Sequence, residues 1–190
     1  MGPLVLAVWF LTALIAGAAG WLERLPPPGP QVVLFLLSAA ALIVATRAPS
    51  IKAWVASLPL AAFVALHLTR FIGLYFVWLY GRGELPYLFA IPCGWGDVVV
   101  ATSAALLLVF AQPLEARPKL TFAWNALGFF DIVFTVLTAS QLATASPASM
   151  AALVRLPLVL LPTFLVPLIL VTHILMFGRL RNALRGDELR

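Results

Sequence analysis

The sequence predicts an all-α protein, a polytopic bundle of about six transmembrane helices with both termini in the cytoplasm, forming a single domain over residues 1–190. Hydrophobic residues make up 63% of the chain and charged residues 10%, whereas soluble domains average ~45–50% and ~25%. The apolar residues form six runs of transmembrane length, which leave no room for a separate soluble domain. The lysines and arginines lie mainly in one alternating set of connections, as the positive-inside rule expects.

The first run is the one that could be confused with a secretory signal. The segment Ala16-Gly17-Ala18 resembles a cleavage site, but no lysine or arginine precedes the apolar stretch, and a signal peptide begins with a basic region. We therefore expect a retained helix. The six predicted spans are residues 3–22, 31–46, 53–80, 85–112, 120–142 and 152–178.

Each later span begins and ends at a polar or proline-containing break, because proline lacks an N–H and clashes with the preceding helical turn. The second span lies between the proline-rich stretch 26–30 and the turn 47–50. The third ends at the glycine-containing turn 81–84 and the fourth at the charged turn 115–119. The fifth ends at 145–147, and the sixth runs from there to the basic C-terminal segment.

The fourth span allows two interpretations, because it contains Pro92, Gly94 and Gly96. A continuous helix places Asp97 at the depth of Arg70. A helix broken at these residues makes Asp97 an N-cap nearer the surface, and broken helices also form binding sites in transporters.

The distribution of basic residues predicts the orientation. Arg24, Arg82 and Arg155 lie in one set of connections. The other set contains more lysine and arginine residues, and this excess predicts that both termini are cytoplasmic. Its members are Arg47, Lys52, Arg117, Lys119, Arg179, Arg181, Arg185 and Arg190. The net charge of +5 is thus explained by orientation in a lipid bilayer, and no nucleic-acid partner is expected.

Five acidic, basic or histidine residues lie well inside the predicted spans, away from their ends, where an arginine or aspartate costs ~2.5–3.5 kcal/mol at the centre. They are His67, Arg70, Asp97, Asp131 and His173. At a rise of 1.5 Å per residue, Arg70 and Asp131 each lie about 15 Å below the outer end of their span. We therefore predict a polar centre of Arg70, Asp97 and Asp131, with His67 and Asn125 as further contacts.

Three functional interpretations stay open. In the first, the polar centre serves small-solute or proton-linked transport, or binds a small-molecule ligand. In the second, His67 and His173 ligate a b-type haem in a membrane redox protein, although their estimated depths differ by ~7 to ~13 Å. In the third, the charges fasten helices together in an accessory subunit of a membrane complex or a homo-oligomer. No catalytic motif is present. The sequence thus gives no positive evidence for an enzyme, and it does not exclude one.

Several segments within residues 65–175 resemble a group of small, uncharacterised bacterial integral membrane proteins. The most specific are Gly94-Trp95-Gly96-Asp97 and the segment 124–131, which contains Trp124, Asn125, Gly128 and Asp131. The resemblance implies a multi-pass protein of the bacterial cytoplasmic (inner) membrane. It implies no particular activity.

Overall fold

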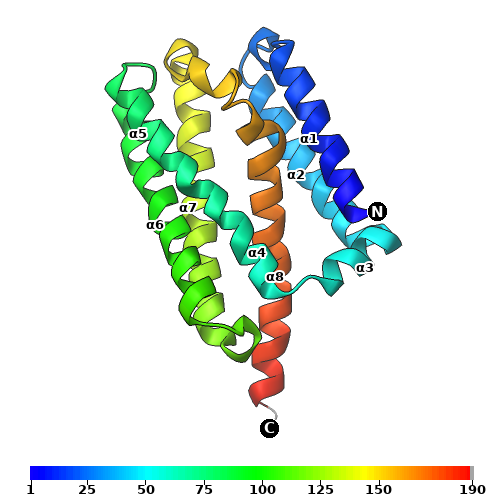
Figure 1. Cartoon of the computed structure of the whole chain (residues 1–190). Helices are drawn as coiled ribbons and strands as arrows, with labels where there is room; N and C mark the ends of the chain where they lie inside the picture. The colour runs from blue at the N-terminus through cyan, green and yellow to red at the C-terminus, as the bar shows by residue number, and fades with distance from the viewer. Residues whose placement is uncertain (189–190) are drawn as a thin grey trace.

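Apolar helices run in alternating directions through the structure, a computed structural model that describes residues 1–188 (Figure 1). The helices are α1 (Gly2–Ala18), α2 (Gly29–Arg47), α3 (Pro49–Ser57), α4 (Leu60–Leu66), α5 (Gly73–Gly81), α6 (Tyr87–Phe110), α7 (Pro118–Ala145) and α8 (Val166–Glu188). Shorter helical segments connect or interrupt them, namely η1 (Leu22–Arg24), η2 (His67–Ile72), η3 (Leu114–Ala116), η4 (Pro147–Val154) and η5 (Leu161–Leu165). The predicted all-α bundle is confirmed.

Five of the predicted spans correspond to helices long and apolar enough to cross a membrane. The first corresponds to α1, an apolar helix of 17 residues, which is shorter than the ~20 residues that a span needs. The five are Gly29–Arg47, Leu60–Gly81, Tyr87–Phe110, Pro118–Ala145 and Leu161–Arg185. The protein is therefore a multi-pass membrane protein.

The third span starts later than the predicted residue 53, because α3 is a separate short helix (Figure 1). Leu58 and Pro59 have extended backbone between α3 and α4. The Leu60 N–H then donates to Glu115 Oε1 at 2.9 Å, and a carboxylate at a helix N-terminus is favourable. Arg179 holds the other side of this break, since its guanidinium donates to the carbonyls of Leu58 and Val55.

The fourth span is a continuous helix, so the interpretation with a break at Pro92–Gly96 is wrong. Helix α6 runs from Tyr87 to Phe110 with Pro92 inside it. Packing against α5 and α7 on either side holds the helix together where local propensity favours an end. Asp97 is therefore a buried side chain in mid-helix, with 4% of its surface exposed.

The sixth span begins at Leu161 and continues to Arg185, later at both ends than the predicted 152–178. Residues 147–154 form η4 at the upper end of the bundle (Figure 1). Within the span, Pro167 cannot donate to the carbonyl of Thr163, four residues earlier. The indole N–H of Trp9 in α1 donates to that carbonyl at 2.9 Å, which is the replacement that a membrane interior requires.

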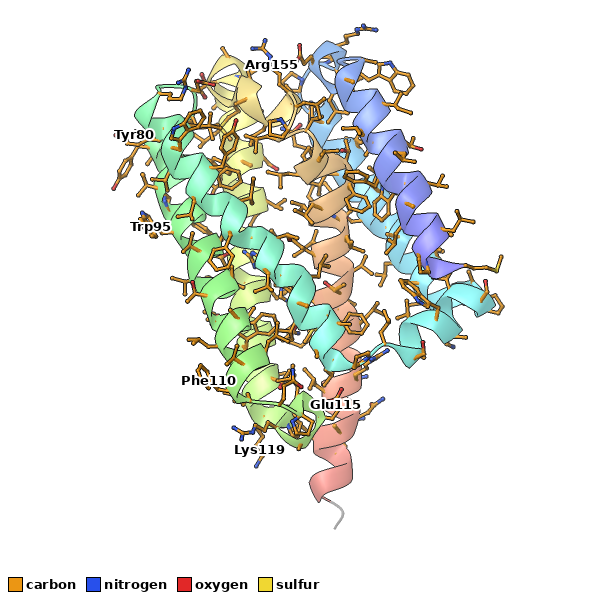
Figure 2. The ribbon with its side chains drawn as sticks, in the orientation of Figure 1. Tyr80, Trp95, Phe110, Glu115, Lys119 and Arg155 are labelled. Carbon is orange, nitrogen blue, oxygen red and sulfur yellow. The ribbon has the colours of Figure 1, made fainter. Side chains whose placement is uncertain are left out.

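The two ends of the bundle differ in their side chains. Figure 2 places Arg155 at the upper end, and Glu115 and Lys119 at the lower end, to which α8 descends. The basic C-terminal residues through Arg185 continue at that end, whereas Arg190 lies outside the described residues. The cytoplasmic location of both termini stays a prediction from this charge distribution.

Candidate functional site

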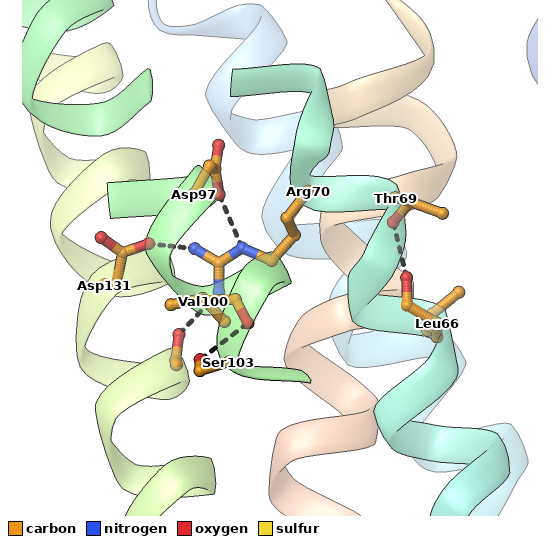
Figure 3. Close-up of polar contacts among 8 residues, drawn as sticks. Leu66, Thr69, Arg70, Asp97, Val100, Ser103 and Asp131 are labelled. Carbon is orange, nitrogen blue, oxygen red and sulfur yellow. Dashed lines mark hydrogen bonds and ion pairs between the residues drawn. The ribbon is translucent and has the colours of Figure 1, made fainter. Parts of the chain in front are cut away.

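Arg70 is the centre of a buried polar cluster that joins three helical elements (Figure 3). Its Nε donates to Asp97 Oδ1 at 2.6 Å, and its Nη1 donates to the Gly128 carbonyl at 2.9 Å. Its Nη2 donates to Asp131 Oδ2. The arginine is 1% exposed, so this guanidinium is neutralised inside the bundle. The structure thus brings together the three charged residues that the sequence assigns to one centre.

The backbone of η2 positions Arg70 relative to His67. A 3₁₀-helix has three residues per turn, so side chains three apart eclipse one another. His67 and Arg70 are three apart in η2, and both are buried. Short 3₁₀ stretches inside a helix often mark functional positions, and here the stretch aligns two polar side chains along one face.

Gly73, Gly94 and Gly96 make room for the cluster. A Cβ atom on Gly73 would overlap the Gly94 carbonyl oxygen, so α5 and α6 touch at their backbones. A Cβ atom on Gly96 would overlap the Asp131 carboxylate. Small residues allow such close approach between membrane helices. The glycines of the 94–97 segment therefore permit helix contact, which brings Asp97 to Arg70, and do not end the helix.

Replacing Gly73 with alanine is expected to destabilise the fold by about 1–3 kcal/mol, the usual cost of overpacking. The added methyl group meets backbone atoms of α6 and would lie 2.8 Å from Asp97 Cβ, and neither can swing away. Unfolding of the purified protein in detergent measures the effect. Gly81→Ala in the same helix is the control, since nothing lies within 4 Å of that position. Equal stabilities of the two variants would contradict the role of this contact.

The two histidines lie side by side, and the predicted difference in their depths is wrong. Their ring centroids are 4.3 Å apart and the rings are inclined by 49°. Both side chains are fully buried. The estimate failed because α4 begins at Leu60 and α8 continues past residue 178. His67 is thus nearer the lower end than a start at residue 53 implies, and His173 is farther from it.

The hydrogen bonds of the pair indicate which ring nitrogens carry protons. Thr172 Oγ1 donates to the Ile169 carbonyl, so at its 3.5 Å contact with His67 Nε2 the histidine is the donor. Asn125 Oδ1, an acceptor, lies 2.8 Å from His173 Nδ1, while the amide nitrogen donates to the His173 carbonyl. In neutral imidazole one nitrogen donates and the other accepts. His67 Nδ1 and His173 Nε2 therefore carry lone pairs, and neither has a hydrogen-bond partner.

The arrangement does not fit a b-type haem. The plane of such a haem lies between its two axial imidazoles, and these two rings are in contact with each other. The opposite side of His67 is also occupied, since Trp124 meets it edge to face at 5.2 Å. Within residues 1–188, no group of three or more His, Cys, Asp or Glu side chains is arranged to hold a metal ion.

A pocket of about 380 Å³ opens beside the arginine cluster. It lies between α2, α7, η4 and the start of the last span, and its lining is mainly apolar. Arg70 and Asp97 belong to its wall. Glu23 and Arg155 also line it and form an exposed ion pair at 3.1 Å, and Arg155 is at the upper end of the bundle (Figure 2).

Two buried polar atoms in this pocket have no hydrogen-bond partner, Gln31 Oε1 and Thr135 Oγ1. Buried polar groups are almost always paired, and both of these residues belong to the wall of the pocket. Thr135 follows Asp131 by one helical turn on α7. The pocket therefore combines apolar walls with polar groups from α2, α6, α7 and η2.

Sequence reasoning did not identify Gln31 or Thr172 as site residues, and it assigned Asn125 to the wrong contact. Asn125 was expected to contact the arginine centre, but it binds His173. Thr172 could have been noticed as the neighbour of His173 in an apolar run. No comparable signal marks Gln31, because it lies at the very start of its span.

Comparisons with known proteins identify a family without an assigned activity. No curated protein and no solved structure matches the chain. The chain belongs to the family described as Domain of unknown function (DUF8737), whose family model matches residues 27–181 and so includes both the arginine cluster and the histidine pair.

Proposed function

We propose that this protein binds, within the membrane, a small apolar molecule that carries an uncharged hydrogen-bonding head group. The observation that carries the proposal is the pocket beside Arg70, in which Gln31 and Thr135 have no partner. Its volume of about 380 Å³ lies within the ~300–1,000 Å³ of small-molecule sites. Apolar walls with a few polar groups are also typical of such sites.

The lining favours an apolar body for the ligand. Side chains such as Leu34, Phe76, Ile132 and Val136 form the walls, and burying a hydrocarbon chain against them yields ~25 cal/mol per Å² when the chain comes from water. In the predicted orientation the pocket opens toward the outer surface, at the end where Glu23 and Arg155 lie.

The charges favour an uncharged head group. Two carboxylates, Asp97 and Asp131, face one guanidinium, so an anion would add a third negative charge to a buried site. A cation would leave water for a mainly apolar pocket, where the two carboxylates already pair with Arg70. A hydroxyl or carbonyl avoids both costs, because Thr135 can donate or accept and Gln31 Oε1 accepts. Binding of this kind is the step shared by the ligand-binding and solute-transport interpretations.

The test uses three probes of equal chain length, namely decanol, decanoate and decylammonium, with the protein in lipid nanodiscs. We expect saturable binding of labelled decanol above that of protein-free discs, and at least ~10-fold weaker binding of both ions, since one uncompensated buried charge costs more than 1.4 kcal/mol. Ala139→Phe places a ring in the pocket and should abolish the binding. Leu137→Phe on the lipid-facing side of α7, where Leu137 is 53% exposed, should leave it unchanged.

Two results would contradict the proposal. If Ala139→Phe and Leu137→Phe bind decanol equally, the molecule is held outside this pocket. If decanoate binds as tightly as decanol, the charge argument for an uncharged head group fails.

A further inference from the structure

A second pocket, of about 370 Å³, is lined by the C-terminal half of α2 together with α1, α3, α4 and α8. It shares no lining residue with the pocket beside Arg70. Its wall extends along α2 from Leu37 to Ala45 and along α8 from Leu168 to Leu175, which is about 12 Å and about 10 Å at 1.5 Å per residue. The pocket is therefore elongated along the helices, and membrane helices run close to the direction of the lipid chains.

The wall of this second pocket suits a hydrocarbon chain. Its lining is almost entirely apolar, and two of its polar side chains already have partners. The Thr172 hydroxyl donates to a carbonyl of its own helix, and the Trp9 indole N–H donates to the Thr163 carbonyl. Val5 and Val44 belong to the wall and are 44% and 42% exposed, so the pocket is open to the lipid around the bundle.

Helix α3 forms one side of the pocket and lies at an angle to α2 and α4, the helices that it connects (Figure 1). Its residues Ile51, Trp54, Val55 and Leu58 line the pocket, whereas Lys52 is exposed. A helix with one apolar face and basic residues on the other is typical of the membrane interface. No residue of α3 is fully buried, so its apolar face is free to pack against a further molecule in the pocket.

Three basic residues lie around this side of the pocket. Arg47 follows Val44, a wall residue, by three positions on the same face of α2, and Lys52 is in α3. Arg179 donates to two backbone carbonyls at the C-terminal end of α3. None of the three forms an ion pair with a side chain that the structure describes. Glu115, which accepts from the first N–H of α4, offsets only one of these charges, so this end of the pocket favours an anion.

We propose that this pocket binds one phospholipid with an anionic head group, with an acyl chain between the helices and the phosphate at Arg47 and Lys52. Basic pockets between transmembrane helices on the cytoplasmic side bind anionic head groups, and in the predicted orientation this end of the bundle faces the cytoplasm. A zwitterionic head group is less favourable, because it adds a positive charge beside the basic residues. The apolar pocket and the charge beside it thus match the two parts of one lipid molecule.

The experiment measures lipid binding to the full chain by native mass spectrometry, with phosphatidylglycerol and phosphatidylcholine of identical acyl chains titrated into the detergent-purified protein. We expect one phosphatidylglycerol per chain, bound at least about fivefold more tightly than phosphatidylcholine, the factor that one charge contributes near a membrane surface. Ala41→Phe places a ring in the pocket and should abolish this binding. Ala39→Phe, at an exposed position of the same helix outside the pocket, should bind like the parent protein.

A pair of charge variants tests the head-group site without altering the packing. Lys52 and Lys119 are both exposed, and Lys119 lies at the lower end of the bundle, outside the pocket (Figure 2). Lys52→Gln should weaken phosphatidylglycerol binding about fivefold, and Lys119→Gln should leave it unchanged.

Three results would overturn the proposal. The two lipids bind equally, the two phenylalanine variants retain phosphatidylglycerol alike, or Lys52→Gln and Lys119→Gln weaken its binding to the same extent. The last result would assign the binding to the general basic charge of this surface. The decanol experiment is independent of all three, because Ala139 lies in the other pocket.

Discussion

Replacing Arg70 with leucine is expected to destabilise the protein by about 3–5 kcal/mol, the range found when one partner of a buried ion pair is removed. The substitution leaves Asp97 and Asp131 facing each other without a counter-charge, and it removes the donor to the Gly128 carbonyl. Chemical or thermal unfolding in detergent, followed by circular dichroism, measures the loss.

Two further variants show whether charge is the cause. Arg82→Leu removes an arginine whose ion pair with Glu84 is exposed, and such pairs contribute less than about 1 kcal/mol. Combining Arg70→Leu with Asp97→Asn and Asp131→Asn removes the unpaired charges, and we expect it to restore part of the stability. If Arg70→Leu were no less stable than Arg82→Leu, the cluster would not support the fold.

The second large effect is expected from Asn125→Leu, which should cost about 2–6 kcal/mol because two buried groups lose their partners at ~1–3 kcal/mol each. The Nδ1–H of His173 loses its acceptor, and the His173 carbonyl loses a donor. Leucine has a similar size, so the loss reflects hydrogen bonding and not a cavity.

Asn182→Leu is the matched control, since Asn182 is exposed on the same helix as His173. It should unfold like the parent protein. An Asn125→Leu protein that keeps full stability would show that the histidine ring is held by packing alone. Unfolding curves for the two leucine variants, recorded under the same conditions, distinguish these cases.

The charged centre was predictable because charge is so rare in this chain. An arginine and two aspartates within apolar runs must find partners inside the bundle, and depths counted at 1.5 Å per residue placed Arg70 and Asp131 at one level. The contact of Arg70 with both aspartates agrees with that expectation. What the cluster binds stays a prediction.

The contact between the two histidines and the continuity of the fourth helix were not predictable in the same way. The depth of His67 depends on where α4 begins, and that start depends on Glu115 and Arg179, which are distant in the sequence. The residues Pro92, Gly94 and Gly96 look like a helix end locally. Whether these residues end the helix depends on α5 and on Asp131, which occupy the space that the glycines leave.

The sequence by itself determined the class of the protein and the short list of polar residues in its interior, because the cost of burying charge depends on composition and on position along an apolar run. Only the tertiary structure decided which of these residues meet, which histidine nitrogens stay unpaired and where the pockets lie. Those outcomes depend on the phase of each helix and on backbone contacts such as that between Gly73 and Gly94. Such contacts join segments far apart in the chain, so no local pattern of residues specifies them.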